Sequence, residues 1–185
     1  MEEWRLVCMG SFFGHLKTVC RHRHKVFLHC VKAGIPMRGL FHDLSKFSPT
    51  EFIPGVKYWQ GTRSPNEVER EKFGHSRAWM HHKGRNLHHY EYWNDINPKT
   101  KQVEPIKMPP KYFAEMVCDR IAASKIYQGK NYQNSHPLKY FRRGRGHMFI
   151  HEETARELEF ILTLLAEKGE DAAFAEVRRV LKEGY

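Results

Sequence analysis

The stretch Phe41-His42-Asp43-Leu44-Ser45-Lys46-Phe47 sets an imidazole and a carboxylate side by side among large apolar residues. On a short helix over residues 37–46, the neighbours Leu40, Phe41 and Leu44 are expected to be buried, and the two polar side chains with them. An uncompensated buried carboxylate costs on the order of several kcal/mol. A neutral imidazole and a carboxylate can bind one cation together, so the pair predicts a metal site, with a nearby basic side chain as the alternative.

Histidines also recur every seven residues before this stretch, at His15, His22 and His29. Seven residues fall about 20° short of two helical turns, so the three side chains share one face of a helix expected over residues 15–33. Val19 and Val26 flank that face, which predicts that at least His22 faces the core. A buried imidazole needs a polar partner or a metal ion.

One carboxylate interrupts an otherwise apolar helix face later in the chain. Asp119 lies on a helix expected from Pro109 or Pro110 through Tyr127, and it shares its face with apolar neighbours. These neighbours are Tyr112, Met116, Ala123 and Ile126. A lone aspartate in such a place is either half of a helix-to-helix salt bridge or a metal ligand. Together with the histidines, Asp119 becomes a candidate ligand.

The series His22, His42-Asp43 and Asp119 resembles the H…HD…D signature of the HD superfamily of metal-dependent phosphohydrolases. The local patterns H-x-x-x-V at His22 and H-D-x-x-K at His42 match as well. The resemblance implies an all-α fold that brings these four side chains to one divalent cation. Residues 42–52, 79–93 and 119–132 look like a small family of bacterial and phage HD-like proteins, known only as a domain of unknown function. That likeness spans roughly residues 18–180 and brings no substrate with it.

The segment from Trp79 to Trp93 is the densest functional candidate, with His81, His82, His88 and His89 within nine residues. Some HD enzymes bind a second metal ion with a later histidine and a His-His pair, and the resemblance offers His82 with His88 or His89 for that role. The gap between them is shorter than in the cyclic-dinucleotide phosphodiesterases of the superfamily. One ion is therefore expected and a second stays open, as does the choice of histidine within each pair. A solvated polar loop is the alternative for the whole segment.

The resemblance to the HD superfamily, together with the chemistry of these residues, implies a hydrolase for an anionic, phosphate-containing small molecule, expected to be a nucleotide. Mixed imidazole and carboxylate ligation suits Mn, Fe, Co, Ni or Zn better than Mg, and the ion would activate water for attack on phosphorus. Asp43 and Lys46 are the expected catalytic residues, and Lys46, Lys83 and Arg85 are expected to bind substrate phosphate. Two alternatives stay open: a di-iron HD-type oxygenase, and a non-enzymatic all-α module that binds nucleic acid.

Charge is unevenly distributed along the 185 residues, whose formal net charge is +10. Residues 151–185 carry five basic and nine acidic side chains, a net of −4, so residues 1–150 hold +14 and twelve of the thirteen histidines. An anionic partner is expected at the basic part. A single HD-like domain is expected over residues 1–185, with an acidic pair of helices at its C-terminal end.

Residues typical of helix starts and helix ends occur along nearly the whole chain, which predicts an all-α fold. Ser48-Pro49-Thr50-Glu51 and Ser64-Pro65-Asn66-Glu67 each combine a capping serine, a first-turn proline and a glutamate three residues after the cap. The second of these helices is expected to reach about His82. Residues 94–105 are expected to form a loop, residues 137–142 a short helix, and residues 151–185 two antiparallel helices that join near Gly169. No strand is expected.

The sequence argues against several classes of protein. No apolar run is long enough to cross a membrane, and Met1-Glu2-Glu3 has the wrong charge for a secretory signal, so a cytoplasmic location is expected. The cysteines at positions 8, 20, 30 and 118 have no disulfide or zinc spacing. The sequence contains no Walker loop, dinucleotide-binding glycine motif or complete H-E-x-x-H.

Overall fold

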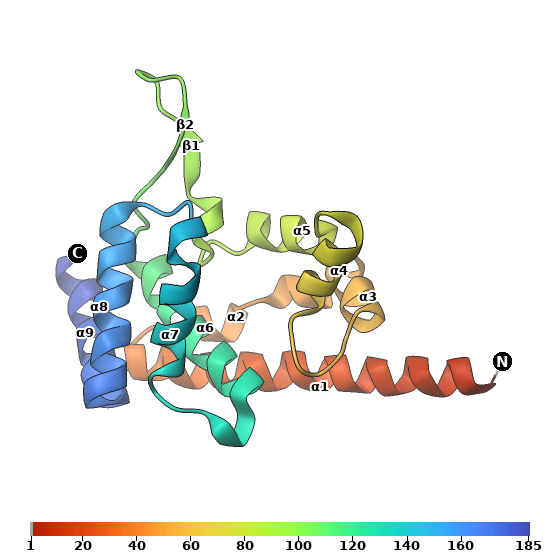
Figure 1. Cartoon of the computed structure of the whole chain (residues 1–185). Coiled ribbons are helices and arrows are strands. Elements are labelled where there is room, and N and C mark those ends of the chain that lie inside the picture. The colour runs from red at the N-terminus through yellow and green to blue at the C-terminus, as the bar shows by residue number, and fades with distance from the viewer. Residues whose placement is uncertain (1) are drawn as a thin grey trace.

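The computed structural model describes residues 2–185, with side chains from residue 11 onward, and is all-α as expected. The helices are α1 (Glu2–Ala33), α2 (Pro36–Phe41), α3 (Pro49–Lys57), α4 (Pro65–Phe73), α5 (Arg77–Arg85), α6 (Pro110–Gln128), α7 (His136–Gly144), α8 (Glu152–Lys168) and α9 (Glu170–Glu183) (Figure 1). Single 3-10 turns lie at Leu44–Phe47, Tyr90–Tyr92, Gly129–Asn131 and Arg145–His147. Among the described residues, none of the helices is both long and apolar enough to cross a membrane.

The long helix α1 is the base on which the other helices pack. In Figure 1, α3, α4 and α5 lie over its N-terminal half, and α8 and α9 stand at its C-terminal end. Helix α6 packs along α1 and carries an almost continuous buried surface that includes Phe113, Val117 and Ile121. Each such side chain contributes roughly 1.5–3 kcal/mol on burial. A rigid α6 is therefore available to hold polar side chains in fixed positions.

The C-terminal pair of helices agrees with the sequence prediction. Helices α8 and α9 pack against each other through buried residues that include Leu158, Leu162, Phe174 and Val177. Gly169 joins them with φ +84°, a left-handed conformation that glycine adopts at little cost. The pair also covers one side of α6.

The histidine face of α1 is buried as predicted. His15 and His22 are 8% exposed and His29 is 4% exposed, and Val19 and Val26 lie between them. Helix α2 approaches this part of α1 closely at Gly39, where a Cβ atom would lie 2.9 Å from the Cα of Phe27. A larger residue at position 39 would push α2 away and displace the residues that follow it.

The prediction of one helix over residues 37–46 is wrong, because the backbone leaves the helix at His42. Helix α2 ends at Phe41, His42 is extended, and Asp43 takes a left-handed conformation (φ 54°, ψ 30°) before a 3-10 turn begins. The apolar neighbours are not buried, since Leu40, Phe41 and Leu44 are 49–60% exposed. Because the backbone reverses here, His42 and Asp43 turn inward while those neighbours face outward.

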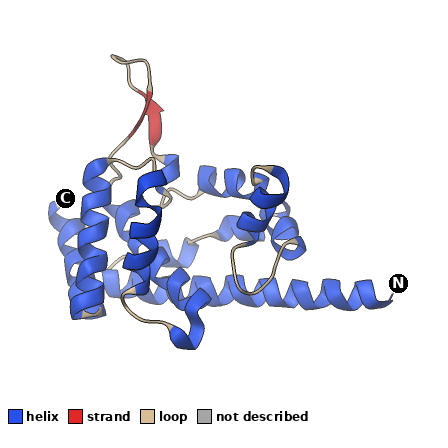
Figure 2. Cartoon of the chain, in the orientation of Figure 1, coloured by secondary structure: helices blue, strands red, loops and turns tan. Residues whose placement is uncertain are grey.

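Other element boundaries also differ from the predictions. Helices begin after Ser48 and Ser64 as expected, but the second ends at Phe73, where Gly74 has φ +75°. Ser76 then caps α5 by accepting a hydrogen bond from the Trp79 backbone N–H. Residues 94–105 form a small antiparallel hairpin of β1 (Asn94–Ile96) and β2 (Val103–Pro105), which projects from the helices (Figure 2). The strands are too short for period-two alternation to be visible in the sequence.

His29 is expected to make the fold sensitive to acid. Its Nδ1 donates to the carbonyl oxygen of Cys118 (3.1 Å), and its Nε2 accepts from Lys125 Nζ (3.0 Å). Burial lowers the pKa of His29 from 6.5 to about 4. Above pH 6.5 the ring is neutral in both states. Between pH 6.5 and 4 only the unfolded chain takes up the proton, so stability falls as the pH falls.

Urea unfolding at pH 7 and pH 5 measures this effect. From pH 7 to pH 5, the free energy of unfolding should fall by about 2 kcal/mol more in the wild-type chain than in His29→Gln. The reason is that glutamine can keep both hydrogen bonds but does not titrate. His24→Gln, on the exposed side of the same helix, is the control and should behave as wild type. Equal losses in wild type and His29→Gln would contradict the assignment.

Candidate metal centre

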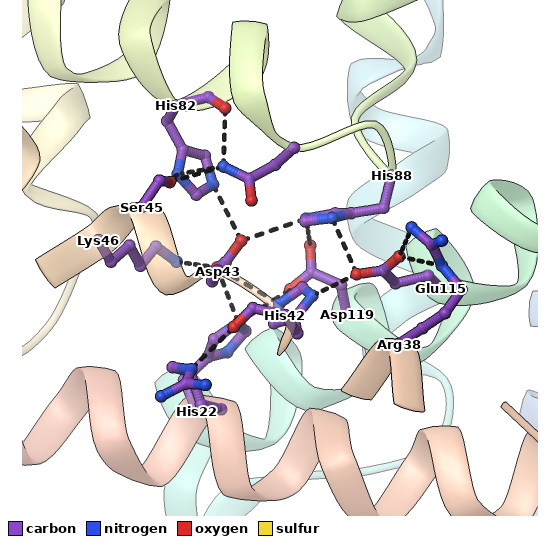
Figure 3. A network of polar contacts seen from close by, with 12 residues as sticks. His22, Arg38, His42, Asp43, Ser45, Lys46, His82, His88, Glu115 and Asp119 are labelled. Atoms are coloured by element: carbon purple, nitrogen blue, oxygen red, sulfur yellow. Dashed lines mark hydrogen bonds and ion pairs between the residues drawn. The ribbon is translucent and has the colours of Figure 1, made fainter. Parts of the chain in front are cut away.

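The four side chains of the H…HD…D series converge from three segments of the fold (Figure 3). His22 on α1 has its Nε2 2.9 Å from Asp119 Oδ1 on α6. His42 has its Nε2 3.3 Å from Asp43 Oδ2 and 3.7 Å from Asp119 Oδ1. His42 and Asp43 are 1% and 0% exposed. The structure thus brings together the residues that the sequence singled out.

A second group of histidines surrounds the other oxygen of the same carboxylate. His82 Nε2 lies 3.3 Å and His88 Nε2 3.5 Å from Asp43 Oδ1. With His89, these residues place one ligand atom each within 4.8 Å of the others. Asp43 therefore stands between two sets of candidate ligands, and both members of the pair His88-His89 face the centre.

Unsatisfied polar atoms show that a cation fits this centre. Twelve buried side-chain atoms in the described part of the chain lack a hydrogen-bond partner, and six of them lie in this centre: His22 Nε2, His42 Nε2, both Asp43 carboxylate oxygens, His88 Nε2 and His89 Nε2. Buried groups of this kind are nearly always paired in native proteins. All six belong to the two sets of candidate ligands. The buried histidine and carboxylate groups can hold a metal ion.

Glu115 orients imidazoles from both sets. Its Oε1 accepts a hydrogen bond from His42 Nδ1 (2.9 Å) and lies 3.3 Å from His88 Nδ1. Its Oε2 binds Arg38 through Nε and Nη2, each at 2.6 Å. Burial opposes the charged form, but the two histidines outweigh it and hold the pKa of Glu115 at about 2. With Nδ1 as donor, the Nε2 of each ring is left free for a metal.

Glu51 binds both members of the pair His81-His82, of which His82 faces the centre. Its two oxygens accept hydrogen bonds from His81 Nδ1 and His82 Nδ1, each at 2.7 Å. His82 directs its Nε2 toward Asp43 and is 2% exposed, whereas His81 lies nearer the surface. His81 therefore acts through Glu51 rather than in the centre.

The charges around Asp43 favour the metal-binding form of Asp43, His22 and His89 but not of His42. Burial disfavours the charged form of His42, but the surrounding carboxylates outweigh it and raise its pKa well above its usual value. Burial disfavours the ionised carboxylate, but His42 and Lys46 outweigh it and hold the pKa of Asp43 well below its usual range. Lys46 Nζ lies 2.6 Å from Asp43 Oδ2. Burial lowers the pKa of His22 and of His89, so both rings are neutral. Ionised carboxylates and neutral imidazoles are the forms that bind divalent ions.

The turn that carries His42 and Asp43 is held by an arginine that the sequence analysis missed. Arg23 donates from Nε to the carbonyl oxygen of His42 (2.8 Å) and from Nη2 to that of Leu40 (2.9 Å). It thereby satisfies carbonyl groups left free at the end of α2. Asp43 can adopt the left-handed conformation at modest cost because its short polar side chain tolerates that region.

Two cavities open onto the centre. One has a volume of about 630 Å³ and is lined by His88, His89 and Asp119 together with residues of α4, α5, α6 and α7. The other has a volume of about 270 Å³ and is lined by His22, Lys46 and His82. A small molecule can reach the candidate ligands through these openings.

The predicted phosphate-binding residues are only partly placed at these cavities. Lys46 lies where expected, but Lys83 lines neither of them. Arg85 is exposed and lines a third cavity of about 390 Å³, which His88 and Glu115 also line. Helix α5 directs Lys83 and Arg85 away because the opposite face of that helix carries Ala78 and His82 into the interior. The larger cavity instead contains four basic residues that the sequence analysis did not select. They are Arg63, Arg120, Lys139 and Arg143.

Replacing Glu115 with glutamine is expected to weaken metal binding by roughly 10- to 100-fold, since an amide holds the two imidazoles and Arg38 less strongly than a carboxylate. Competition with a chromophoric chelator measures the affinity. Glu159→Gln is the matched control, because Glu159 pairs with Arg142 on the surface. Equal affinities of wild type and Glu115→Gln would show that Glu115 has no orienting role.

Comparison with known proteins gives one match. A family model described as a family of unknown function (DUF5662) matches residues 11–164. Neither the curated proteins nor the solved structures contain a significant match. The matched range includes all the candidate ligands and the residues that orient them.

Proposed function

The chain belongs to the DUF5662 family of unknown function, and we propose that it is a metal-dependent phosphohydrolase of the HD-like type that acts on a nucleotide. The observation that carries this proposal is Asp43. Its carboxylate is completely buried and ionised, it pairs with Lys46 Nζ at 2.6 Å, and each of its oxygens faces a separate set of imidazoles. Asp43 could therefore serve as a ligand in either set.

The residues divide into two ligand sets that share Asp43. His22, His42, Asp43 and Asp119 would hold one divalent transition metal, and Asp43, His82, His88 and His89 would hold a second. The imidazole-rich composition favours Mn, Fe, Co, Ni or Zn. When bound, such ions polarise a phosphoryl oxygen and lower the pKa of a coordinated water toward neutrality.

The chain's own contribution is to fix positive charge at the site and to hold the imidazoles in place. Lys46 borders the smaller cavity and is tied to Asp43, and that carboxylate raises the pKa of the ammonium group against the opposing effect of burial. Its positive charge is thus permanent, and it can stabilise negative charge that develops on a phosphoryl oxygen. Glu115 and Glu51 keep the imidazoles in place during this step.

A substrate screen tests the proposal. The purified chain, reconstituted separately with Mn²⁺, Co²⁺, Ni²⁺, Zn²⁺ or Fe²⁺, would be incubated with nucleoside mono-, di- and triphosphates and cyclic dinucleotides, and the products separated by chromatography. We expect metal-dependent hydrolysis of at least one nucleotide. Iron-dependent oxygen uptake without hydrolysis would favour the oxygenase alternative. Nucleic-acid binding that is indifferent to substitution of Asp43 would favour the non-enzymatic one.

A further inference from the structure

Helix α7 presents three faces with different partners. Leu138 and Phe141 are buried in the core. Arg142 pairs with Glu159 of α8 (2.7 Å), and beyond the end of α7, Arg145 pairs with Glu152 (2.6 Å). The remaining face lines the 630 Å³ cavity with four residues spaced three, four and seven apart. They are His136, Lys139, Tyr140 and Arg143.

Three of the four basic side chains on this cavity wall lack acidic partners. Arg63 is already neutralised by Glu71, at 2.5 and 2.7 Å. By contrast, Arg120, Lys139 and Arg143 have no carboxylate within 4.0 Å among the side chains of residues 11–185. Glu67 and Glu91 line the same cavity and are likewise farther than 4.0 Å from these three cations.

Of these three cations, Arg120 gives the strongest indication of an anionic ligand. Its Nε is buried without a hydrogen-bond partner in the described part of the chain, and its guanidinium lies 5.7 Å from the centre of the Tyr90 ring. Leaving a buried charged donor unpaired costs free energy that an anionic ligand would recover. Tyr140 lines the same cavity and carries Arg143 over its ring at 5.3 Å. Two of the three cations thus lie over aromatic rings that line the cavity.

The same cavity reaches the metal centre through His88, His89 and Asp119. One phosphate group at that centre is matched by the metal ligands and Lys46. The three further unpaired cations carry more positive charge than one phosphate requires. The cavity volume of about 630 Å³ lies within the range of roughly 300–1,000 Å³ found for small-molecule sites.

We propose that the cavity binds a nucleotide with a second phosphate group, separate from the one at the metal centre, and that Arg120, Lys139 and Arg143 hold this second phosphate. The inference rests on the proposed function for the first phosphate. The three cations Arg120, Lys139 and Arg143, here called the cation wall, can be tested by binding measurements alone. The aromatic rings beside the cations offer flat surfaces for the base.

Isothermal titration of the full-length, metal-loaded chain tests the proposal. The probes are adenosine 3′,5′-bisphosphate and adenosine 5′-monophosphate, and the variants are Lys139→Gln and Arg143→Gln. We expect the bisphosphate to bind wild type at least about tenfold more tightly than the monophosphate, since a charge-assisted hydrogen bond contributes on the order of one decade of affinity or more. Each variant should lose about tenfold for the bisphosphate and little for the monophosphate.

Arg142→Gln is the matched control, because it removes the same charge from the adjacent residue, whose partner is Glu159 on the outer face. It should bind both probes within twofold of wild type. Equal affinity of wild type for the two probes, or equal losses in Arg142→Gln and Arg143→Gln, would overturn the proposal. Tighter binding of a single-stranded 12-mer oligonucleotide, dependent on the same residues, would assign the wall to a nucleic-acid strand instead and overturn it as well.

The failure of the proposed function gives a different result. In that case the bisphosphate still binds through Lys139 and Arg143, but no phosphoester is hydrolysed. This result would leave the cation wall supported and the chemistry at the metal centre refuted.

Discussion

Replacing Asp43 with asparagine is expected to lower the rate of phosphoester hydrolysis by about a thousandfold or more. Asparagine has the same shape and tolerates the left-handed conformation at position 43, so the turn should survive. What it lacks is the negative charge that both ligand sets share. Loss of a metal at this step removes several kcal/mol of transition-state stabilisation, and about 1.4 kcal/mol corresponds to each tenfold in rate.

Initial rates on the best nucleotide from the substrate screen measure the effect. Asp95→Asn makes the same chemical change on the exposed hairpin and should keep the wild-type rate. Circular dichroism of both variants checks that they remain helical. A folded Asp43→Asn variant that hydrolyses the nucleotide at the wild-type rate would refute the role given to this carboxylate.

Removing the metal is expected to lower the melting temperature by roughly 10 °C. A ligand at a thousand times its dissociation constant stabilises the native state by about 4 kcal/mol, and in a chain of this size each 1 kcal/mol shifts the melting temperature by about 2–4 °C. The structural reason is that six of the buried atoms without hydrogen-bond partners belong to the candidate ligands, and a bound ion would satisfy them.

Differential scanning calorimetry in the presence of EDTA and of excess Mn²⁺ measures this shift. Asp43→Asn should melt at the same temperature in both solutions, whereas Asp95→Asn should show the full wild-type shift. A wild-type chain that melts at one temperature in both solutions has no metal-linked stability. A shift of equal size in Asp43→Asn would place the bound ion elsewhere in the molecule.

The fold and the inner part of the centre could be predicted because their signals are local. Helix caps, the seven-residue spacing of histidines and the apolar face around Asp119 each depend on residues within a few helical turns. The prediction for His42 and Asp43 was right about burial but wrong about its cause. Arg23 and Gly39 help to form a backbone reversal, which no periodicity in residues 37–46 reveals.

The residues that orient the centre could not be predicted, because they act across long sequence separations. Glu115 meets His42 across 73 positions, and Glu51 meets His82 across 31. The basic residues that line the 630 Å³ cavity were missed for a related reason. Arg142 and Arg143 are adjacent and identical in sequence, and only the packing of α7 on α8 shows that the first faces an acid and the second faces the cavity.

Elemental analysis of the reconstituted chain is the most direct test of the central claim. The protein would be loaded with Mn²⁺, freed of excess metal by gel filtration, and assayed for metal per chain beside Asp43→Asn. We predict two ions per wild-type chain and a near-complete loss in Asp43→Asn. A folded wild-type chain that retains no ion, whichever transition metal is offered, would contradict the account.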